Sequence, residues 1–401
     1  MGSLRNIALA VLAISLITFV ALFGRLPALR KTPVGGLQRL LCQRLPALLH
    51  ALDVRITGGR MTAVCSRLVD YLLYKKNPVV LIIYLGLLTS ASLLFLYNAS
   101  ASLPPSLLAP VLFLLPLPYL FTYLCASLHP SINASLHITR SNHADRLRDY
   151  PYDRLLFRPG QTCTTCALPK PARSKHCSLC GTCIARCDHH CPWVNNCIGR
   201  SNQRYFLALL LSLFALETYG AYLALLLLSP IFPPQQQPTP TPFWSLPDLA
   251  RTAEALATAI HRGGISIAGV GLLAATTAPL PLALLVYHIY LIWAGATTNE
   301  SQKWADWRED MADGVVFKAR LSAVSAHERG RADREGRVVA CEDGVVVEWP
   351  VRSDQVVVRT DDGRPPVGQE ALWERVWGLD GVDNIYDLGF WDNLMEVLKG
   401  R

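Results

Sequence analysis

The residues best suited to chemistry lie between Cys163 and Cys197, where 35 residues hold eight of the chain's twelve cysteines and three of its ten histidines. Structural zinc sites take four thiolate or imidazole ligands, commonly starting with Cys-x2-Cys pairs. The supply consists of Cys163-x2-Cys166, Cys177-x2-Cys180-x2-Cys183, His176, Cys187, His189, His190, Cys191 and Cys197. Two tetrahedral sites would use eight of these eleven groups, so three are left for other work.

Spacing alone does not identify the three surplus groups, but the run from Asp188 to Cys191 narrows the choice. It places an acid, imidazoles and a thiol within four residues, as in a nucleophile site where an acid orients a base and the base activates a thiol. A cysteine thiol has a pKa near 8.5, so an adjacent imidazolium and a nearby zinc centre would both favour the reactive thiolate. Cys191 is therefore the candidate nucleophile.

Two other interpretations compete with this one. Most cytosolic Cys-x2-Cys clusters are structural zinc modules, and a membrane-anchored RING-type ubiquitin ligase would also carry one. A RING ends with a late Cys-x2-Cys pair, and the chain has none after Cys183. The Asp-His-His-Cys run argues against a purely structural module.

The elements that must position these residues cross a membrane. The chain has 401 residues, of which 51% are apolar, and long uncharged runs of this kind indicate a polytopic α-helical membrane protein. We expect about five transmembrane helices, a loop-rich cytosolic domain with two zinc ions, and a small mixed cytosolic C-terminal region. The five runs are 7–23, 78–97, 104–128, 205–228 and about 268–293.

Charge predicts which side of the membrane each loop occupies. The first run resembles a signal peptide, but no small-residue cleavage site follows it, which favours an uncleaved anchor. Residues 24–77 carry ten basic and two acidic side chains, and residues 129–204 carry eleven and four. Basic segments beside spans stay cytosolic. The N-terminus is then lumenal, and the cysteines lie in the reducing cytosol, where metal binding or catalysis is expected rather than disulfides.

These observations predict six segments. They are an anchor over 1–23, a cytosolic basic segment over 24–77, two spans in 78–128, the cysteine-rich domain over 129–204, two spans in 205–296 with a Pro-rich lumenal loop over 229–267, and a cytosolic region over 297–401.

The C-terminal region is charged and valine-rich. We expect a hairpin that turns at Asp343-Gly344 in "RVVACEDGVVVEWP" and a third strand in "DQVVVRT". We expect "NIYDLGFWDNLMEVL" to form an aromatic-rich helix that rests on the membrane or on the catalytic region.

The net charge of +8 indicates a protein that contacts anionic lipid or binds a phosphorylated ligand. Binding to nucleic acid is a weaker explanation, because the basic residues lie beside the spans. Glu217 and His288 lie inside predicted spans. Ionisable residues there are functional candidates, although each could simply hydrogen-bond within the helix bundle.

The segment from Cys163 to Phe206 resembles the cysteine-rich domain of the DHHC protein S-acyltransferases. The match runs through the Cys-x2-Cys pairs, Lys170-Pro171, Arg173, His176-Cys177, Asp188 to Trp193, Asn196-Cys197, Gly199, Asn202 and Phe206. That family also carries a Thr-Thr-x-Glu motif after its last span, and Thr297, Thr298 and Glu300 stand in that place. With the flanking spans, the resemblance covers about residues 78–300.

The resemblance implies a role for each of these residues. Asp188 would orient His189 as the base, and Cys191 would take the acyl group. Cys187 has no role in the family. Lys170, Arg173 and Lys175 fall where the family contacts the phosphates of coenzyme A, although they could equally be a solvated basic face. The implied zinc ligands are Cys163, Cys166, His176 and Cys183 for one ion, and Cys177, Cys180, His190 and Cys197 for the other.

Within the family, "TTNESQKWADWREDMADG" and "NIYDLGFWDN" resemble the fungal endoplasmic-reticulum branch that acylates SNARE-type proteins. This implies an endoplasmic reticulum membrane protein whose substrates carry juxtamembrane cysteines. The family's Asp-Pro-Gly after the span preceding the cluster is here His129-Pro130-Ser131, and serine adopts positive φ less readily than glycine.

The expected reaction is a two-step thioester exchange with palmitoyl-CoA as donor. Exposing a palmitoyl chain of about fourteen methylenes to water would cost about 11 kcal/mol at ~0.8 kcal/mol each. A nucleophile at the bilayer surface avoids that cost because the chain stays between helices. The alternative in another class is a membrane zinc scaffold that binds partners without catalysis.

Overall fold

The computed structural model describes residues 20, 31–231, 254, 257, 258, 261, 262, 264–327 and 347–400. The chain divides into two compact units, Met1–Asn77 and Pro78–Arg401. The predicted first span, the Pro-rich "PPQQQPTPTP" and the turn of the predicted C-terminal hairpin lie outside the described residues.

Four candidate membrane spans occur among the described residues, and they confirm the four predicted runs after residue 77. Their limits are Val79–Ser102, Pro105–Ala126, Gln203–Leu228 and Ser266–Trp293. The helices that form them are α5 (Val79–Ala99), α6 (Pro105–Leu114), α7 (Pro116–Ala126), α10 (Gln203–Leu228), α12 (Val270–Thr277) and α13 (Pro279–Trp293). Short 3-10 and π-helical turns, Ser100–Ser102, Ser229–Ile231 and Ile265–Gly269, extend them.

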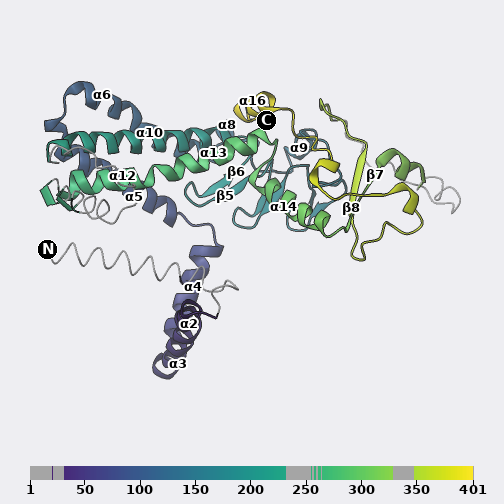
Figure 1. The fold of residues 1–401 in the computed structure, drawn as a ribbon, viewed down its shortest axis with the longest axis horizontal. Coiled ribbons are helices and arrows are strands. Elements are labelled where there is room, and N and C mark those ends of the chain that lie inside the picture. Colours follow the sequence, from purple (N-terminus) through teal and green to yellow (C-terminus); the bar gives the residue numbers. More distant parts are fainter. Residues whose placement is uncertain are drawn as a thin grey trace, which may run out of the picture. The chain divides into compact units, whose positions relative to one another are not determined.

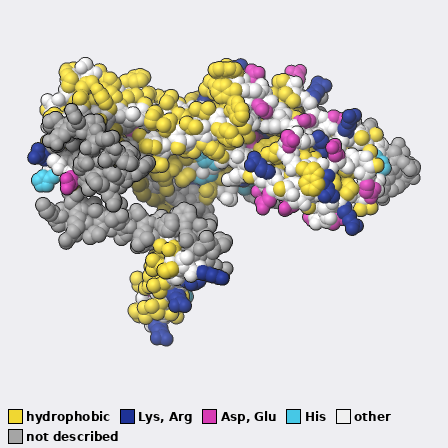
Figure 2. Space-filling model, in the orientation of Figure 1, with side chains coloured by type: hydrophobic (Ala, Val, Ile, Leu, Met, Phe, Trp, Pro, Cys, Tyr) yellow, Lys and Arg dark blue, Asp and Glu magenta, His cyan; other side chains and the backbone are white. Residues whose placement is uncertain are grey.

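The third span, α10, packs against α7, α12 and α13 (Figure 1). Gly271 shows how closely α12 approaches it, because a Cβ at this position would lie 2.3 Å from the Ala224 Cβ. Small residues allow such backbone approach in membrane bundles. Hydrophobic side chains cover this helical end of the molecule, whereas charged ones are scattered over the end where β7 and β8 lie (Figure 2).

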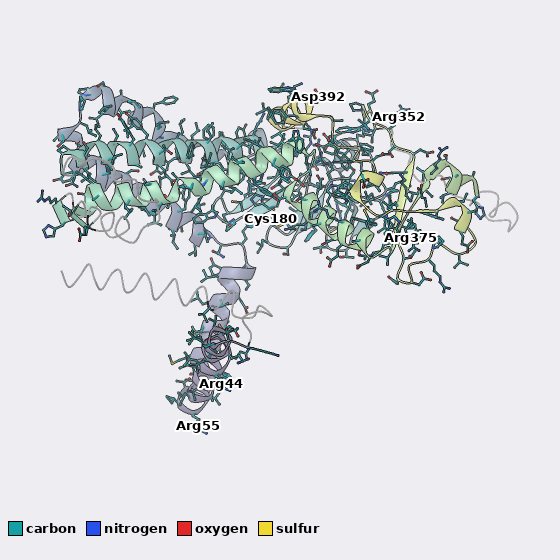
Figure 3. The ribbon with its side chains drawn as sticks, viewed as in Figure 1. Arg44, Arg55, Cys180, Arg352, Arg375 and Asp392 are labelled. Atoms are coloured by element: carbon teal, nitrogen blue, oxygen red, sulfur yellow. The ribbon has the colours of Figure 1, made fainter. Side chains whose placement is uncertain are left out.

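Three two-stranded hairpins make up the cysteine-rich region that follows α8 (Pro130–Asn133) and α9 (His143–Leu147). The hairpins are β1–β2 (Thr162–Cys163 with Leu168–Pro169), β3–β4 (Lys175–Cys177 with Thr182–Ile184) and β5–β6 (His189–Cys191 with Asn196–Ile198). Cys180, in the turn of β3–β4, is labelled in Figure 3. Two-stranded hairpins this short are marginally stable by themselves, so the fold of this region depends on contacts beyond the strands, such as the small apolar clusters around Leu136 and Ile138.

The C-terminal region begins with α14 (Thr298–Ala312) and continues into a three-stranded antiparallel sheet in the order β8-β7-β9. The strands are β7 (Val316–Arg320), β8 (Gln355–Arg359) and β9 (Glu374–Arg375), with 3-10 turns at Glu370–Leu372 and Leu379–Gly381. Strand β8 confirms the strand predicted for "DQVVVRT". The predicted final helix is shorter than expected. Helix α16 spans Phe390–Lys399, and residues 384–389 before it form no helix or strand.

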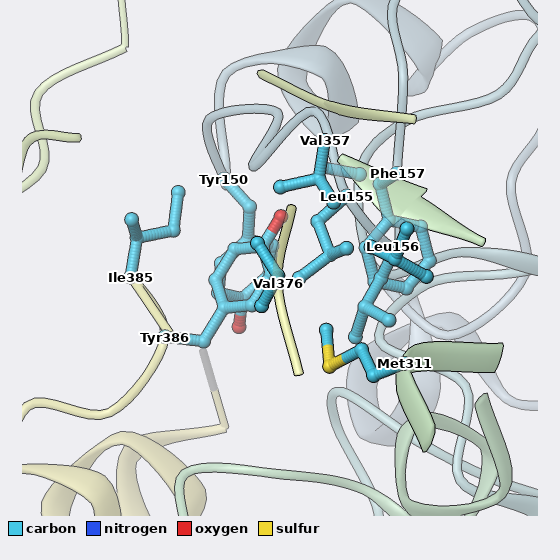
Figure 4. Packing of buried hydrophobic residues seen from close by; sticks show 11 residues of the cluster. Tyr150, Leu155, Leu156, Phe157, Met311, Val357, Val376, Ile385 and Tyr386 are labelled. Carbon is cyan, nitrogen blue, oxygen red and sulfur yellow. The ribbon is translucent and has the colours of Figure 1, made fainter. Parts of the chain in front are cut away.

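A hydrophobic core joins this region to the chain that precedes the cysteine cluster (Figure 4). Tyr150 and Leu155–Phe157 pack there with Met311 of α14, Val357 of β8 and Tyr386. Rings of Tyr150, Phe157 and Tyr386 meet edge to face at centroid distances of 6.0–6.2 Å, a favourable aromatic geometry. The cysteine-rich and C-terminal regions therefore form one body.

The first unit is helical. It contains α2 (Pro33–Arg39), a π-helical turn over Leu40–Arg44, α3 (Leu45–Thr57) and α4 (Arg60–Tyr74). Gly58 and Gly59 join α3 to α4 with φ of 69° and 85°, a conformation that glycine adopts without a steric penalty.

Candidate active site

The three hairpins of the cysteine-rich region repeat one pattern every 14 residues. Cys163, Cys177 and Cys191 end the first strand of each hairpin and face Leu168, Thr182 and Asn196 on the second strand. The turns share a residue with positive φ, which is Ala167, Gly181 and Asn195 in turn. This repeat explains how each metal-ligand group is assembled.

Each group combines the turn of one hairpin with a cross-strand pair from the next. Cys163 and Cys166 of β1–β2 meet the His176–Cys183 pair of β3–β4, and Cys177 and Cys180 of β3–β4 meet the His190–Cys197 pair of β5–β6. These two groups coincide with the zinc-ligand sets that the family resemblance implies. All eight residues have ligand atoms within 4.8 Å of the others in their group.

The distances within both groups fit tetrahedral zinc. The His176 Nδ1 lies 3.4–3.9 Å from its three sulfurs, the His190 Nδ1 lies 3.4–3.7 Å from its own, and the Cys180 and Cys197 sulfurs are 3.6 Å apart. Zinc–sulfur and zinc–nitrogen bonds of ~2.3 and ~2.05 Å at tetrahedral angles separate ligand atoms by about 3.5–3.8 Å. The cysteines are free thiols, so both groups could hold a zinc ion.

The third hairpin turns the catalytic candidates away from the metal ligand. Successive side chains of a strand point to opposite faces, so in β5 His189 and Cys191 share one face while His190 takes the other. The His189 Nδ1 lies 2.5 Å from the Asp188 Oδ2, and His189 and Cys191 line the same cavity. The structure thus brings Asp188, His189 and Cys191 together in the order that the sequence predicted, with Cys191 outside both ligand groups.

The C-terminal region holds Asp188 in place. The backbone N–H of Thr298 donates to Asp188 Oδ1 at 2.8 Å, and its hydroxyl donates to Oδ2 at 2.9 Å. Thr297 donates its hydroxyl to the Cys187 carbonyl at 3.1 Å. The Thr-Thr-x-Glu motif therefore contacts Asp188, the acid of the predicted triad, rather than Cys191.

Electrostatics favour an ionised Asp188–His189 pair. Burial would raise the pKa of Asp188, but hydrogen bonds from His189 and Thr298 and the nearby imidazoles outweigh it and lower this pKa to about 2. Burial likewise opposes a charged His189, yet its bonds to Asp188 and Cys191 raise the pKa of His189 to about 9. By contrast, burial and the Asp188 charge raise the pKa of the Cys187 thiol to about 12, so this spare thiol is inert.

Glu300 completes the Thr-Thr-x-Glu motif in a structural role. It forms a capping box with Thr297 at the start of α14 and binds both the Nε and Nη2 of Arg173, at 2.8 and 2.7 Å. The Arg173 guanidinium also lies 4.7 Å from the Tyr386 ring centroid and 3.7 Å from Glu396. This buried pair connects the cysteine-rich region to the C-terminal region.

Arg173 therefore departs from the expectation of a phosphate contact. Its side chain is fully buried, with 0% exposed, and its charge is neutralised by Glu300 and Glu396, so it has no access to a soluble ligand. Lys170 and Lys175, from the same predicted group, instead line a cavity of about 300 Å³. Arg158 and Lys303, which no sequence motif marks, line it as well, together with Tyr152 and Phe157.

A second cavity, of about 610 Å³, extends from the candidate catalytic residues to the span helices. His189, Cys191 and Trp193 line it at one end, and its walls are almost wholly apolar side chains from α5, α10, α12 and α13. Cys191 itself packs with Phe206, Leu209 and Leu210 at the start of α10. An apolar cavity of this size is typical of a ligand site, and its lining suits a hydrocarbon chain.

The two ionisable residues inside the spans have different surroundings. His288, on α13, is 1% exposed, and its ring centroid lies 5.8 Å from that of His189 and 5.2 Å from that of Phe206. It thus packs directly behind the candidate base. Glu217 lines the 610 Å³ cavity, away from Cys191.

Comparisons with known proteins agree with this geometry. A sequence model described as DHHC palmitoyltransferase matches residues 157–305. The chain is 40% identical to "Palmitoyltransferase SWF1" of Neurospora crassa, over 99% of this chain and 92% of that protein. It is 37% identical to "Palmitoyltransferase swf1" of Schizosaccharomyces pombe, over 98% and 96%. To "Palmitoyltransferase ZDHHC4" of Mus musculus it is 49% identical, over 28% and 31%.

Proposed function

The chain belongs to the DHHC palmitoyltransferase family, in its Swf1 branch, and from this premise we propose that Cys191 is the residue that carries the acyl group. The protein is a multi-pass membrane protein S-palmitoyltransferase acting on membrane proteins, which sets aside the alternative of a zinc scaffold without activity. Each step of acyl transfer can be assigned to individual residues of the site.

In the first step, the Cys191 thiolate attacks the thioester carbonyl of palmitoyl-CoA. The new carbon–sulfur bond forms as the bond to the CoA sulfur breaks, and the His189 imidazolium donates its proton to the departing CoA thiolate. Asp188 keeps this imidazolium oriented through the 2.5 Å contact at Nδ1, which leaves the other ring nitrogen for the sulfur. Such an acid–base–thiol arrangement is a recurring solution for acyl transfer.

In the second step, His189 takes the proton of a substrate cysteine thiol, and the resulting thiolate attacks the Cys191 thioester. The acyl group moves to the substrate, and Cys191 leaves as a thiolate. One thioester replaces another in both steps, so no external energy source is needed.

The two cavities support palmitoyl-CoA as the donor. The apolar cavity reaches Cys191 and offers the acyl chain an environment that replaces water, while the cavity with Lys170, Lys175, Arg158 and Lys303 suits the phosphates. Tyr152 in the same cavity supplies an aromatic face for a base. When bound, the zinc ions would cross-link the three hairpins, which are too short to hold Cys191 in place by themselves.

We also assign the cysteine-rich and C-terminal regions to the cytosol, the protein to the endoplasmic reticulum membrane, and SNARE-type proteins to its substrates. The excess of basic residues in 24–77 and 129–204 supports the first assignment. Resemblance to the fungal branch supports the other two. A protease-protection assay on sealed microsomes tests the topology, and cleavage of the cysteine-rich region only after detergent is added would contradict it.

The observation that carries the proposal is the position of Cys191, outside both metal-ligand groups, beside His189 and at the end of the apolar cavity. The test incubates purified Cys191→Ser with radiolabelled palmitoyl-CoA. It should form no hydroxylamine-sensitive acyl-enzyme, whereas the matched control Cys187→Ser, which changes a buried thiol four residues away, should form it normally. Both should retain two zinc ions, and labelling of Cys191→Ser would overturn the assignment.

A further inference from the structure

The hairpin formed by α3 and α4 has a fixed internal geometry. Asp53 near the end of α3 accepts the backbone N–H of Thr62 at 2.7 Å and that of Met61 at 3.3 Å, and it also accepts the Thr62 hydroxyl at 2.7 Å. These bonds satisfy donors at the start of α4. With the two left-handed glycines between the helices, they hold the turn in one conformation.

Both helices carry an apolar stripe that no residue in the described part of the chain covers. The members recur at spacings of three and four, which places them on one side of each helix. On α3 they are Leu45 (41% exposed), Leu48 (57%), Leu49 (55%), Leu52 (44%) and Ile56 (78%), and on α4 Met61 (64%), Val64 (56%), Leu68 (55%), Tyr71 (41%) and Leu72 (39%). Ten exposed apolar side chains on adjoining helices indicate a surface that is normally in contact with something.

The charge of the same segment identifies the kind of partner. Residues 33–77 contain seven Lys or Arg side chains and two Asp. Figure 2 shows hydrophobic side chains over the left of this unit and Lys and Arg toward its right and at its lower tip, and Figure 3 labels Arg44 and Arg55 among the basic residues. Helices with an apolar face and a basic polar face lie in the headgroup layer of anionic membranes.

Chain continuity favours a bilayer over another protein. The last residue of α4, Tyr74, is followed after four residues by Val79, which begins the first described span. Four extended residues cover about 14 Å, so α4 must end close to the membrane surface. Lys75 and Lys76 occupy this junction, where basic side chains meet anionic headgroups.

We propose that the α3–α4 hairpin lies in the headgroup layer and binds anionic lipid, on the same side of the membrane as Cys191. The side follows from counting, because two spans, Val79–Ser102 and Pro105–Ala126, separate the hairpin from the cysteine-rich region. The hairpin would thus be a second membrane contact of the enzyme beside its spans, at the leaflet where substrate cysteines must approach. This role of the hairpin is independent of the assignment of Cys191.

The test uses the full-length enzyme in nanodiscs of phosphatidylcholine with or without phosphatidylserine. The photoreactive amino acid p-benzoylphenylalanine replaces Leu68 in one variant and Ser66 in the other. Both positions are exposed on α4, but they differ by about 200° around the helix, so Ser66 is the matched control. Illumination should give lipid adducts from position 68, detected by mass spectrometry, and few from position 66. Intact labelling with palmitoyl-CoA verifies that each variant is folded.

The lipid preference is tested with Arg55→Gln/Arg60→Gln/Arg67→Gln. Removing three cations should lower the yield of lipid adducts at position 68 in phosphatidylserine nanodiscs by about fivefold or more, and raising the salt concentration should act in the same direction. Adducts between position 68 and another protein segment or a second copy of the enzyme would overturn the proposal. Equal lipid adducts from positions 66 and 68, or a yield unaffected by phosphatidylserine, would do so too.

Discussion

Replacing Asp188 by asparagine tests whether the acid of the catalytic run works through charge. Asp188 is 2% exposed and accepts hydrogen bonds from the His189 Nδ1 and from both the N–H and the hydroxyl of Thr298. Asn has nearly the same shape but only one acceptor oxygen. At least one of these donors would therefore face an NH2 group, and the negative charge beside the imidazole would be lost.

The expected loss of rate in Asp188→Asn can be estimated from the pKa of His189. Its pKa is about 9 in the folded protein, against an ordinary value of 6.5. That difference corresponds to roughly 3 kcal/mol at ~1.4 kcal/mol per pKa unit. Burial opposes the charged imidazole, while Asp188 and Cys191 both favour it, so this net figure sets only the order of magnitude of the carboxylate's effect. We expect Asp188→Asn to slow acylation of Cys191 by about 10²- to 10³-fold at neutral pH.

The assay is single-turnover acylation with radiolabelled palmitoyl-CoA, with zinc content measured on the same preparation. Thr298→Val gives a graded comparison, since it removes one charge-assisted hydrogen bond worth about 1.5 kcal/mol and should cost about tenfold. Two results would refute the reasoning. One is acylation by Asp188→Asn within threefold of the unmodified enzyme, and the other is loss of zinc in parallel with activity, which would mean that Asp188 acts on the fold.

Three further predictions concern other parts of the site. Glu300→Gln should lower the free energy of unfolding by about 3–5 kcal/mol, because it leaves the fully buried Arg173 without its bidentate partner. Thermal melting measures this loss of stability. The double variant Arg173→Met/Glu300→Gln should recover part of it. Lys170→Gln/Lys175→Gln should raise KM for palmitoyl-CoA with little change in kcat, and a fall in kcat alone would exclude these lysines from phosphate binding. The His189 pKa is raised in the folded state, so the stabilisation from its imidazolium is complete below about pH 6.5 and is lost as pH rises through 9. The acylation rate should therefore fall above pH 9. A pH–rate profile that stays flat to pH 10 would exclude His189 as the proton donor.

The sequence could predict those features that depend on local spacing. Four spans follow from hydropathy, which is a property of about twenty consecutive residues. The metal-ligand groups follow from Cys-x2-Cys spacing and the family pattern, and the structure brings together the same residues. Two further patterns in the sequence also report the local structure. The 14-residue recurrence of Cys163, Cys177 and Cys191 reports the hairpin repeat, and Thr297-x2-Glu300 is a capping box that marks the start of α14.

Features that depend on distant partners could not be predicted. Lys170, Arg173 and Lys175 look alike in sequence, but Arg173 is buried because Glu300, more than a hundred residues later, reaches it. His288 gains its place behind His189 only when α13 packs beside α10. Arg158 precedes Cys163 in the sequence and Lys303 follows Cys197 by more than a hundred residues, yet both line the same cavity. In each case, tertiary packing decides which of several equivalent side chains meets the site.

The hairpin repeat also explains why one cysteine is left over for catalysis. Cys191 occupies in the third hairpin the position that Cys163 and Cys177 occupy in the first two, where each joins a metal-ligand group completed by the next hairpin. No fourth hairpin follows, because the chain enters α10 at Gln203. Val194 stands where the second cysteine of the pair would be. Cys191 is thus held by the same backbone geometry as a metal ligand but has no metal site to complete, and it packs against the start of α10, where it lines the apolar cavity.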